Sequence, residues 1–386
     1  MSARTPRGPA RRTAQVVLGA VVVAHGCVHL LGAAAGLGRA DLGGLEVSTA
    51  AGAAWAAVAA VTVAAGLALV AGRRRWWWLG AVAVTGSLVL VATHWPDAAP
   101  ALVPDAVLLA AVAHGRWCES PRSLRGRYRS GVAAALAGSA PGGPLSDADV
   151  DTLPAPVARY VRRTGAVGRP RVDAVRATLR GRIRNGPDQP WMTFTGEQVN
   201  TYGPRPTRHF LLDATRGGLP VDVLHALTEG TATMDARVLS VAPVVRGAGP
   251  EMDHGEAVTL FNDLCLLAPA ALVDAPVTWR QLDDRRVAGT YRTGDQEVSA
   301  VLVFDAEGDL VDFVSDDRLR SSPDGRSFTP VRWSTPVDGF GDFRGRRLLT
   351  AGRAVWHGPD GPFVYAEMAL DDIETDLRDL PGSSIA

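Results

Sequence analysis

The sequence contains no lysine, only three cysteines, and very little aspartate or glutamate before residue 145. All forty basic residues are therefore arginine, a bias that coding composition explains more simply than a need for guanidinium geometry. Cys27, Cys118 and Cys265 are widely separated, which argues against a disulfide framework or a site built on several cysteines. Because the acidic residues are so unevenly placed, the net charge of zero describes neither part of the chain.

Motifs of catalysis are missing as well. There is no glycine-rich phosphate loop, no nucleophile elbow and no Cys-x-x-Cys. Asp253 and His254 resemble half of an acid–base pair, but no suitable serine or cysteine accompanies them, and a helix N-cap is the simpler interpretation. His209, His225 and His357 lack metal-ligand spacing. We therefore predict no catalytic residue, no metal and no cofactor. Nucleic acid is not an expected partner, because acidic residues balance the arginines of the second part.

Long apolar runs dominate the first third of the chain. Crossing about 30 Å of hydrocarbon takes about 20 apolar residues in a helix. Four stretches come near this length, namely Thr13–Leu37, Ser48–Gly72, Trp76–Thr93 and Ala98–Trp117. The fourth is the weakest, because it contains Pro100, Pro104 and Asp105. We predict a four-helix transmembrane domain over residues 13–117. A cleaved signal peptide is the competing interpretation of the first run, but its apolar core is too long and more runs follow.

The arginines predict the orientation of these helices. They cluster before the first run, at Arg73–Arg75 in the second loop, and at Arg116–Arg129 after the fourth run, while the other two loops hold only Arg39. With four spans all clusters lie on one side, which the positive-inside rule assigns to the cytoplasm. Three spans would put the last cluster outside. We thus expect a multi-pass protein of the cytoplasmic membrane, with a cytoplasmic tail over residues 1–12 and a cytoplasmic soluble domain.

Two histidines lie within the first apolar run. His25 and His29 are four residues apart and so share one helical face, as two ligands of one metal or haem would. We expect no acidic or further histidine partner at the same depth. The simpler interpretation is that each histidine bonds the backbone or a hydroxyl of a neighbouring helix.

The second part of the chain has the pattern of a soluble β domain. Residues 118–144 are expected to form an arginine-rich juxtamembrane segment and a flexible linker, and residues 381–386 a C-terminal tail. A capping box from Ser146 to Asp149 predicts a short helix. From residue 171 to about 373 the period is two, with turn sequences between the segments and no helix between most of them. This pattern predicts an antiparallel meander over residues 145–380.

One helix is predicted to interrupt the strands. Gly255–Ala268 places six apolar residues on a wide arc, and Pro269 ends it. Glu256, Thr259 and Asp263 fall on the opposite arc, where we expect solvent. Such a helix covers a sheet or closes the mouth of an open barrel.

Several stretches resemble an uncharacterised bacterial membrane family. They are Leu153–Gly165 (LPAPVARYVRRTG), Leu260–Pro269 (LFNDLCLLAP), Asp305–Leu310 (DAEGDL), His25–Leu31 (HGCVHLL) and Trp95–Ala98 (WPDA). In that family a DoxX-like four-helix unit precedes a β domain similar to the half-barrels of lipoprotein carriers. The resemblance implies a fold and no established activity, although the DoxX part would suggest redox or quinone association in some relatives.

A row of arginines alternates with apolar residues along the first predicted strand. The four are Arg176, Arg180, Arg182 and Arg184. The simplest interpretation is a solvated sheet face. The functional alternative is contact with anionic lipid headgroups, worth about 1 kcal/mol for each arginine near the surface.

Our leading hypothesis is a binding module tethered at the bilayer, whose curved sheet holds a lipophilic ligand. The candidate lining residues are four tryptophans with two amides at a rim: Trp191, Trp279, Trp333, Trp356, Gln198 and Asn200. Ordinary core packing is the alternative for the tryptophans. Two other hypotheses remain open, a structural or regulatory membrane protein whose β domain binds another protein, and a redox enzyme that uses the membrane half.

Overall fold

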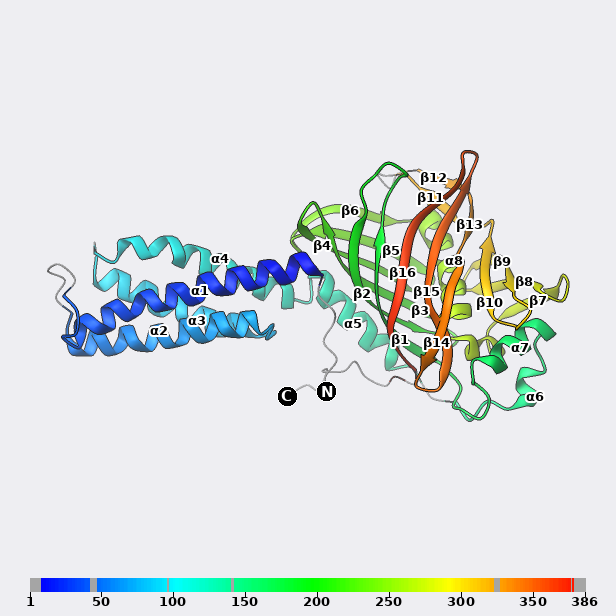
Figure 1. Cartoon of the computed structure of the whole chain (residues 1–386), viewed down its shortest axis with the longest axis horizontal. Helices are drawn as coiled ribbons and strands as arrows, with labels where there is room; N and C mark the ends of the chain where they lie inside the picture. Colours follow the sequence, from blue (N-terminus) through cyan, green and yellow to red (C-terminus); the bar gives the residue numbers. More distant parts are fainter. Residues whose placement is uncertain are drawn as a thin grey trace. The chain divides into compact units, whose positions relative to one another are not determined.

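The computed structural model describes residues 8–41, 47–95, 97–139, 142–322, 327–375 and 377. The chain divides into two compact units, one over residues 9–126 and one from residue 127 onward (Figure 1). The tail expected at residues 381–386, most of the tail at 1–12 and one of the predicted turn sequences, residues 323–325, lie outside the described residues.

The first unit is a bundle of helices. Its elements are α1 (Pro9–Gly36), α2 (Thr49–Val70), α3 (Trp76–Thr93), the short 3-10 helix η1 (Ala99–Ala101) and α4 (Leu102–Glu119). Helix α3 has the predicted bounds, and Ser48 caps α2 by accepting a hydrogen bond from the Ala51 amide at 3.2 Å. Three helices, α1 to α3, are long and apolar enough to cross a membrane. Helix α4 falls short of that composition, so the fourth span remains a prediction.

Glycines let α1 and α2 approach closely. A Cβ atom on Gly36 would lie 2.5 Å from the Gly52 Cα atom, and one on Gly19 would lie 3.0 Å from the Gly66 carbonyl oxygen. Close approach through small residues is how helices pack where lipid surrounds them. Consistent with such surroundings, many valines and leucines on these helices are exposed, among them Val17, Val28 and Val89.

The second unit is built on one large antiparallel sheet. Its strand order is β6-β5-β4-β3-β2-β1-β16-β15-β13-β10-β9-β8-β7, and β14 pairs with β15 at the side. The strands are β1 (Ala174–Ile183), β2 (Met192–Thr201), β3 (Thr207–Arg216), β4 (Leu219–Thr228), β5 (Thr231–Val238), β6 (Ala242–Ala248), β7 (Val277–Gln281), β8 (Arg286–Thr293), β9 (Gln296–Phe304), β10 (Leu310–Ser315), β13 (Arg332–Ser334), β14 (Val337–Phe343), β15 (Arg346–Gly358) and β16 (Gly361–Thr375). A separate two-stranded sheet pairs β11 (Leu319–Ser321) with β12 (Phe328–Pro330). The antiparallel β domain is confirmed.

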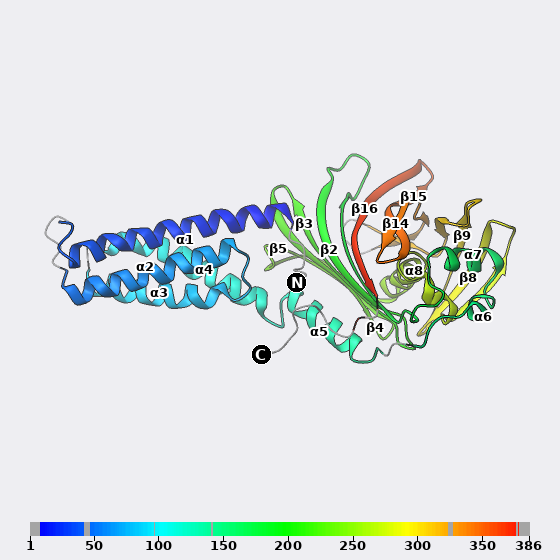
Figure 2. The same ribbon diagram turned by 60° about the horizontal axis from the view of Figure 1, so that its bottom comes forward.

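Helix α8 (Pro250–Leu267) is the covering helix that the sequence predicts. The sheet curves around it (Figure 2), and its buried residues Val258, Phe261 and Leu264 belong to the main apolar core. We call the side of the sheet that faces α8 the inner face, and the opposite side the outer face. The 3-10 helix η2 (Pro269–Val273) follows directly.

Two short helices precede the first strand. The predicted capping box is present, because Ser146 and Asp149 each bond the other's backbone amide at the start of α6 (Asp147–Val150). Helix α7 (Ala155–Arg163) follows, and Tyr160 donates a hydrogen bond of 3.0 Å to the Cys265 carbonyl oxygen of α8. Arg163 forms two hydrogen bonds of 2.9 Å with Asp309 in the β9–β10 turn. Three stretches that carry the family resemblance therefore hold one another in place.

The predicted flexible linker is partly wrong. Residues 124–136 form helix α5 (Leu124–Leu136), and the compact β unit already begins at Arg127. Val132 and Leu136 are buried, and the Tyr128 hydroxyl donates a hydrogen bond of 2.9 Å to Glu197 on the outer face. The alanine-rich composition that suggested flexibility is equally suited to a helix that packs closely on a sheet.

Candidate functional site

The inner face of β2, β3 and β4 carries a row of polar side chains. The register pairs Asn200 with Arg208, Gln198 with Phe210, and Phe210 with His225, so these residues point to the same side of the sheet. Helix α8 lies against this row and adds Glu256 and Asp263. Gln198 and Asn200, both predicted rim residues, are therefore brought together, although they are buried under α8 and not at an exposed edge.

Arg208 is the centre of this buried network. Its Nη1 atom donates to Glu256 Oε2 at 2.9 Å, and its Nε atom donates to Asp263 Oδ2 at 2.7 Å. The side-chain amides of Gln198 and Asn200 also donate to Asp263 Oδ2, at 2.6 and 3.1 Å. The side chains of Arg208 and Glu256 are only 7% and 2% exposed, so these ion pairs are shielded from water.

Charge pairing controls the protonation of this network. Burial, the largest single effect, would raise the pKa of Glu256, but Arg208, His225 and Arg318 together hold it well below its usual range. Burial likewise opposes the charged form of Arg208, yet Asp263 and Glu256 raise its pKa. Both partners therefore stay charged at neutral pH, and each depends on the other for compensation.

An aromatic group continues from the polar network. Trp333 of β13 and Trp356 of β15 are opposite each other in the register, and both are buried. Tyr365 stacks on Trp356 at a ring-centroid distance of 5.4 Å and accepts a hydrogen bond of 3.1 Å from Trp333 Nε1. Two of the four predicted lining tryptophans are thus neighbours on the inner face.

Arg318 connects the aromatic group to the charges. Its guanidinium lies over Trp333 and Trp356, at 5.7 and 6.0 Å from the ring centroids, and 3.9 Å from Glu256 Oε1. Its Nε atom is buried and has no hydrogen-bond partner among the described residues. The Nε–H donor of Arg318 is therefore unsatisfied among the described residues.

A second apolar cluster occupies the inner face on the other side of the polar row. It is separate from the main core and consists of buried residues on β1 to β5: Leu179, Phe194, Phe210, Leu212, Ala214, Val221 and Ala236. Phe210 forms the junction between this cluster and the polar row. Its ring centroid lies 5.3 Å from the guanidinium carbon of Arg208 and 6.5 Å from the centroid of the His225 ring. Apolar and charged groups therefore adjoin on one continuous face.

The other two tryptophans have different surroundings. Trp279 packs over Gly289 and against Phe261, at a ring distance of 6.3 Å, as part of the edge of the main core. Trp191 lies between the guanidinium groups of Arg182 and Arg184, at 4.5 and 4.4 Å. Trp191 is thus engaged with the arginine row, and the structure does not bring it to the polar network.

The arginine row lies on the outer face and is largely paired. Arg176 is 3% exposed and donates to Glu197 at 2.6 Å, so it is buried and unavailable to a lipid headgroup. That part of the headgroup prediction is wrong, because α5 brings Tyr128 onto Glu197 and covers this end of β1. The exposed Arg180 and Arg182 form ion pairs with Asp371 and Glu367 of β16. Their contact with lipid, and that of Arg184, stays a prediction.

Two acidic residues of the site were misplaced by the sequence pattern. Glu256 and Asp263 were expected to face solvent, but both point into the inner face. An amphipathic pattern separates polar from apolar arcs, but it does not show whether the polar arc faces water or a charged residue such as Arg208.

The predicted N-cap at Asp253 and His254 is wrong, because the helix begins earlier, at Pro250. Asp253 accepts a bond from the Ala232 amide, and His254 contacts Gln296.

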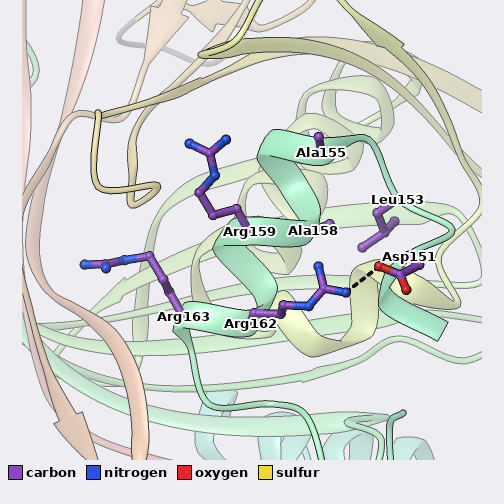
Figure 3. Close-up of a pocket in the computed structure, with 7 residues that line it drawn as sticks. All are labelled: Asp151, Leu153, Ala155, Ala158, Arg159, Arg162 and Arg163. Carbon is purple, nitrogen blue, oxygen red and sulfur yellow. Dashed lines mark hydrogen bonds and ion pairs between the residues drawn. The ribbon is translucent and has the colours of Figure 1, made fainter. Parts of the chain in front are cut away.

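A hollow of about 680 Å³ lies on the surface along α7 (Figure 3). Its lining contains three arginines, of which Arg162 turns toward Asp151 and Arg163 bonds Asp309. These ion pairs stabilise α7 on its neighbours. The hollow is distinct from the inner face. Two of its three arginines, Arg162 and Arg163, already pair with carboxylates of the protein.

One of the two histidines of α1, His25, has an acidic partner that the sequence pattern did not suggest. His25 Nε2 lies 2.9 Å from Asp105 Oδ1 of α4, and Ser87 donates to Asp105 Oδ2 at 2.8 Å. The His29 ring is 4.6 Å from that of His25. The expectation of no acidic partner at this depth is wrong, because Asp105 was considered only as a weakness of the fourth run.

Together these features define a class of protein, in which an apolar helical unit precedes a curved antiparallel β domain with charged and aromatic groups on its inner face. The chain belongs to DUF6544, a family of unknown function, whose model matches residues 143–368. That match covers most of the β domain. No curated protein matches the sequence.

The chain is similar at low identity to several solved structures, two of which follow. A DUF1329 family protein from Desulfovibrio piger is 12% identical, with 61% of this chain and 95% of that chain covered and a TM-score of 0.34. A LolA superfamily protein from Nitrosomonas europaea is 11% identical, with 61% and 96% covered and a TM-score of 0.33. At these values the likeness carries no argument about a ligand, which must come from the site itself.

Proposed function

We propose that this protein is a membrane-anchored binding protein whose β domain holds an amphipathic lipophilic ligand on its inner face. The observation that carries the proposal is the junction at Phe210, where the separate apolar cluster of β1 to β5 meets the Arg208 network. Lipophilic sites combine a mainly apolar lining with a few placed polar groups, which is the composition of this face.

The apolar cluster suits the hydrocarbon part of such a ligand. Leu212, Val221 and Val223 alternate with outward residues along β3 and β4, and Met368 and Ile183 extend the same surface. The cluster does not belong to the main core around α8. A hydrocarbon chain that lay along it would gain about 25 cal/mol for each Å² of apolar surface removed from water.

The charged network suits a polar or anionic head. Arg318 offers a buried Nε donor with no partner among the described residues, and it lies beside two tryptophans. Arg208 is already paired with Glu256 and Asp263. We therefore assign recognition of the head to Arg318, and positioning of α8 on the sheet to Arg208.

The proposal predicts saturable labelling by a lipid-like probe. Full-length protein in detergent is incubated with a photoactivatable fatty acid, irradiated, and cleaved to separate the helical unit from the β domain. The β domain should be labelled to a plateau, and extracted membrane lipid should compete. Labelling that rises without limit, or is confined to the helices, would contradict a binding site in the β domain.

We further propose four spans, with the β domain on the cytoplasmic side. The support is that arginine clusters lie at the start of α1, between α2 and α3, and from the end of α4 onward. Reporter fusions after Ser139, beyond the end of α5, should then give fluorescent GFP and no alkaline phosphatase activity. Fusions within residues 37–41, between α1 and α2, are the matched control and should give the reverse. Phosphatase activity after Ser139 would mean that α4 does not span.

A further inference from the structure

Exposed apolar residues of the β domain gather at two hairpin tips. Among the described residues of the β domain, five large apolar side chains are exposed. One of them, Leu282, lies away from the two hairpins. The other four are Leu219, Leu239, Val241 and Val244, between 47% and 53% exposed. We call these four residues the tip patch. So strong a concentration on one surface marks an interaction site more often than chance placement does.

The two hairpins are neighbours in the sheet. Leu219 begins β4 after the turn from β3, and Leu239 and Val241 form the turn between β5 and β6. Strands β4 and β5 pair directly, with Val221 opposite Val238, and the Leu239 amide donates to the Pro220 carbonyl at 2.9 Å. The four side chains are therefore displayed from the same end of adjacent strands.

The backbone holds this turn in an unfavourable conformation. Leu239 and Ser240 have φ values of 52° and 63°, in the left-handed region that favours glycine and asparagine. Ser240 is buried and its hydroxyl donates to the carboxylate of the buried Asp222, which fixes the turn. A large apolar side chain at a strained, exposed turn is poorly explained by stability alone, and a binding role explains it better.

The exposed charge around the patch is positive. Arg216 is exposed at the end of β3, and the Arg246 side chain is 70% exposed on β6. The acidic residues of these strands add little negative charge to the surface. Asp213 and Asp222 are buried, and Asp235 is paired with Arg127 and Arg246. A surface with apolar tips and basic flanks matches the interface of an anionic bilayer.

We propose that the tip patch docks the β domain onto an anionic lipid bilayer, with Leu239, Val241 and Val244 inserted at the level of the headgroups. The β domain is covalently joined to three helices that are long and apolar enough to cross a membrane. The patch adjoins the apolar cluster, because Val221, Val238 and Val245 lie directly behind it. Docking is nevertheless independent of whether that cluster binds a ligand.

Hydrogen exchange of the unmodified full-length protein tests the docking. The protein is placed in nanodiscs of phosphatidylcholine with phosphatidylglycerol, in nanodiscs of phosphatidylcholine alone, and in detergent. The amides within residues 216–220 and 238–244, apart from Pro220 and Pro243, which have none, should exchange more slowly in the anionic nanodiscs than in the other two. The β4–β5 turn at Glu229, which has no exposed large apolar residue, is the internal control and should exchange equally in all three.

A double substitution separates the patch from the rest of the domain. Leu239→Asp with Val241→Asp should remove the slowing at 216–220 while the circular dichroism spectrum is unchanged, because both side chains are exposed. A variant that does not fold leaves the native-protein measurement to decide. Equal exchange at 238–244 in anionic nanodiscs and in detergent would overturn the proposal, as would equal slowing at Glu229. Neither readout measures acyl-probe labelling, so failure here is distinct from failure of the proposed function.

Discussion

Replacing Arg208 by methionine is expected to lower the free energy of unfolding of the β domain by about 3–5 kcal/mol. The substitution leaves the buried Glu256 and the partly buried Asp263 without the guanidinium that they share at 2.9 and 2.7 Å. The more distant Arg318, at 3.9 Å from Glu256, compensates only in part. For a domain of this size the loss corresponds to a fall in the melting temperature of roughly 10 °C.

The measurement is thermal unfolding of the full-length protein in detergent, followed by tryptophan fluorescence. Arg182→Met is the matched control. Arg182 also forms an ion pair with a carboxylate, that of Glu367, but this pair is exposed to solvent. Exposed pairs contribute about 0–1 kcal/mol, so its melting temperature should hardly change. Arg208→Met combined with Glu256→Met and Asp263→Leu should recover much of the loss, since no uncompensated charge remains. Equal effects of Arg208→Met and Arg182→Met would show that the network is not buried as described.

A phenyl ring in place of Ala214 is expected to reduce labelling by the photoactivatable fatty acid about tenfold or more, equivalent to at least ~1.4 kcal/mol of binding free energy. Ala214 lies on the inner face of β3 within the apolar cluster, between Phe194 of β2 and Val221 of β4. The larger side chain would fill space that the proposal assigns to the ligand. Because the substitution adds apolar volume and no charge, folding should be retained at a moderate cost.

Thr193→Phe is the matched control for this prediction. Thr193 is adjacent to Phe194 on β2 but exposed on the outer face, so labelling should match that of the natural protein. Both variants must first show the melting transition of a folded domain. If folded Ala214→Phe protein is labelled as strongly as the control, the ligand does not lie on this part of the inner face.

Local features of the fold were predictable from the sequence. The capping box at Ser146, the bounds of α3 and the position of α8 all follow from contacts within a few residues along the chain. In β4, Asp222 alternates with Val221 and Val223 as a period of two predicts, but the inward-facing His225 breaks the apolar pattern. Asp222 is buried because Ser240 of a later turn bonds it, which no local pattern shows.

The site depended on contacts distant in sequence, which explains what was missed. Arg208 meets α8 residues 48 and 55 positions later, and Arg318 reaches the same helix from a later segment. A single sequence shows the charges but not their pairing, so Asp263 was assigned to solvent. Gln198, Asn200, Trp333 and Trp356 could be chosen as amides and large aromatics in strands. Their connection through Arg318 and Glu256 required the fold.

Peptide-resolved mapping of the photoactivatable fatty acid tests most directly whether the inner face of β1 to β5 binds a lipophilic ligand. After irradiation of the full-length protein, mass spectrometry identifies the labelled peptides. The proposed function predicts that competable labelling falls on residues 192–228, which contain Phe194, Phe210, Leu212 and Val221. Competable labelling restricted to residues 9–119, with none on these strands, would contradict it.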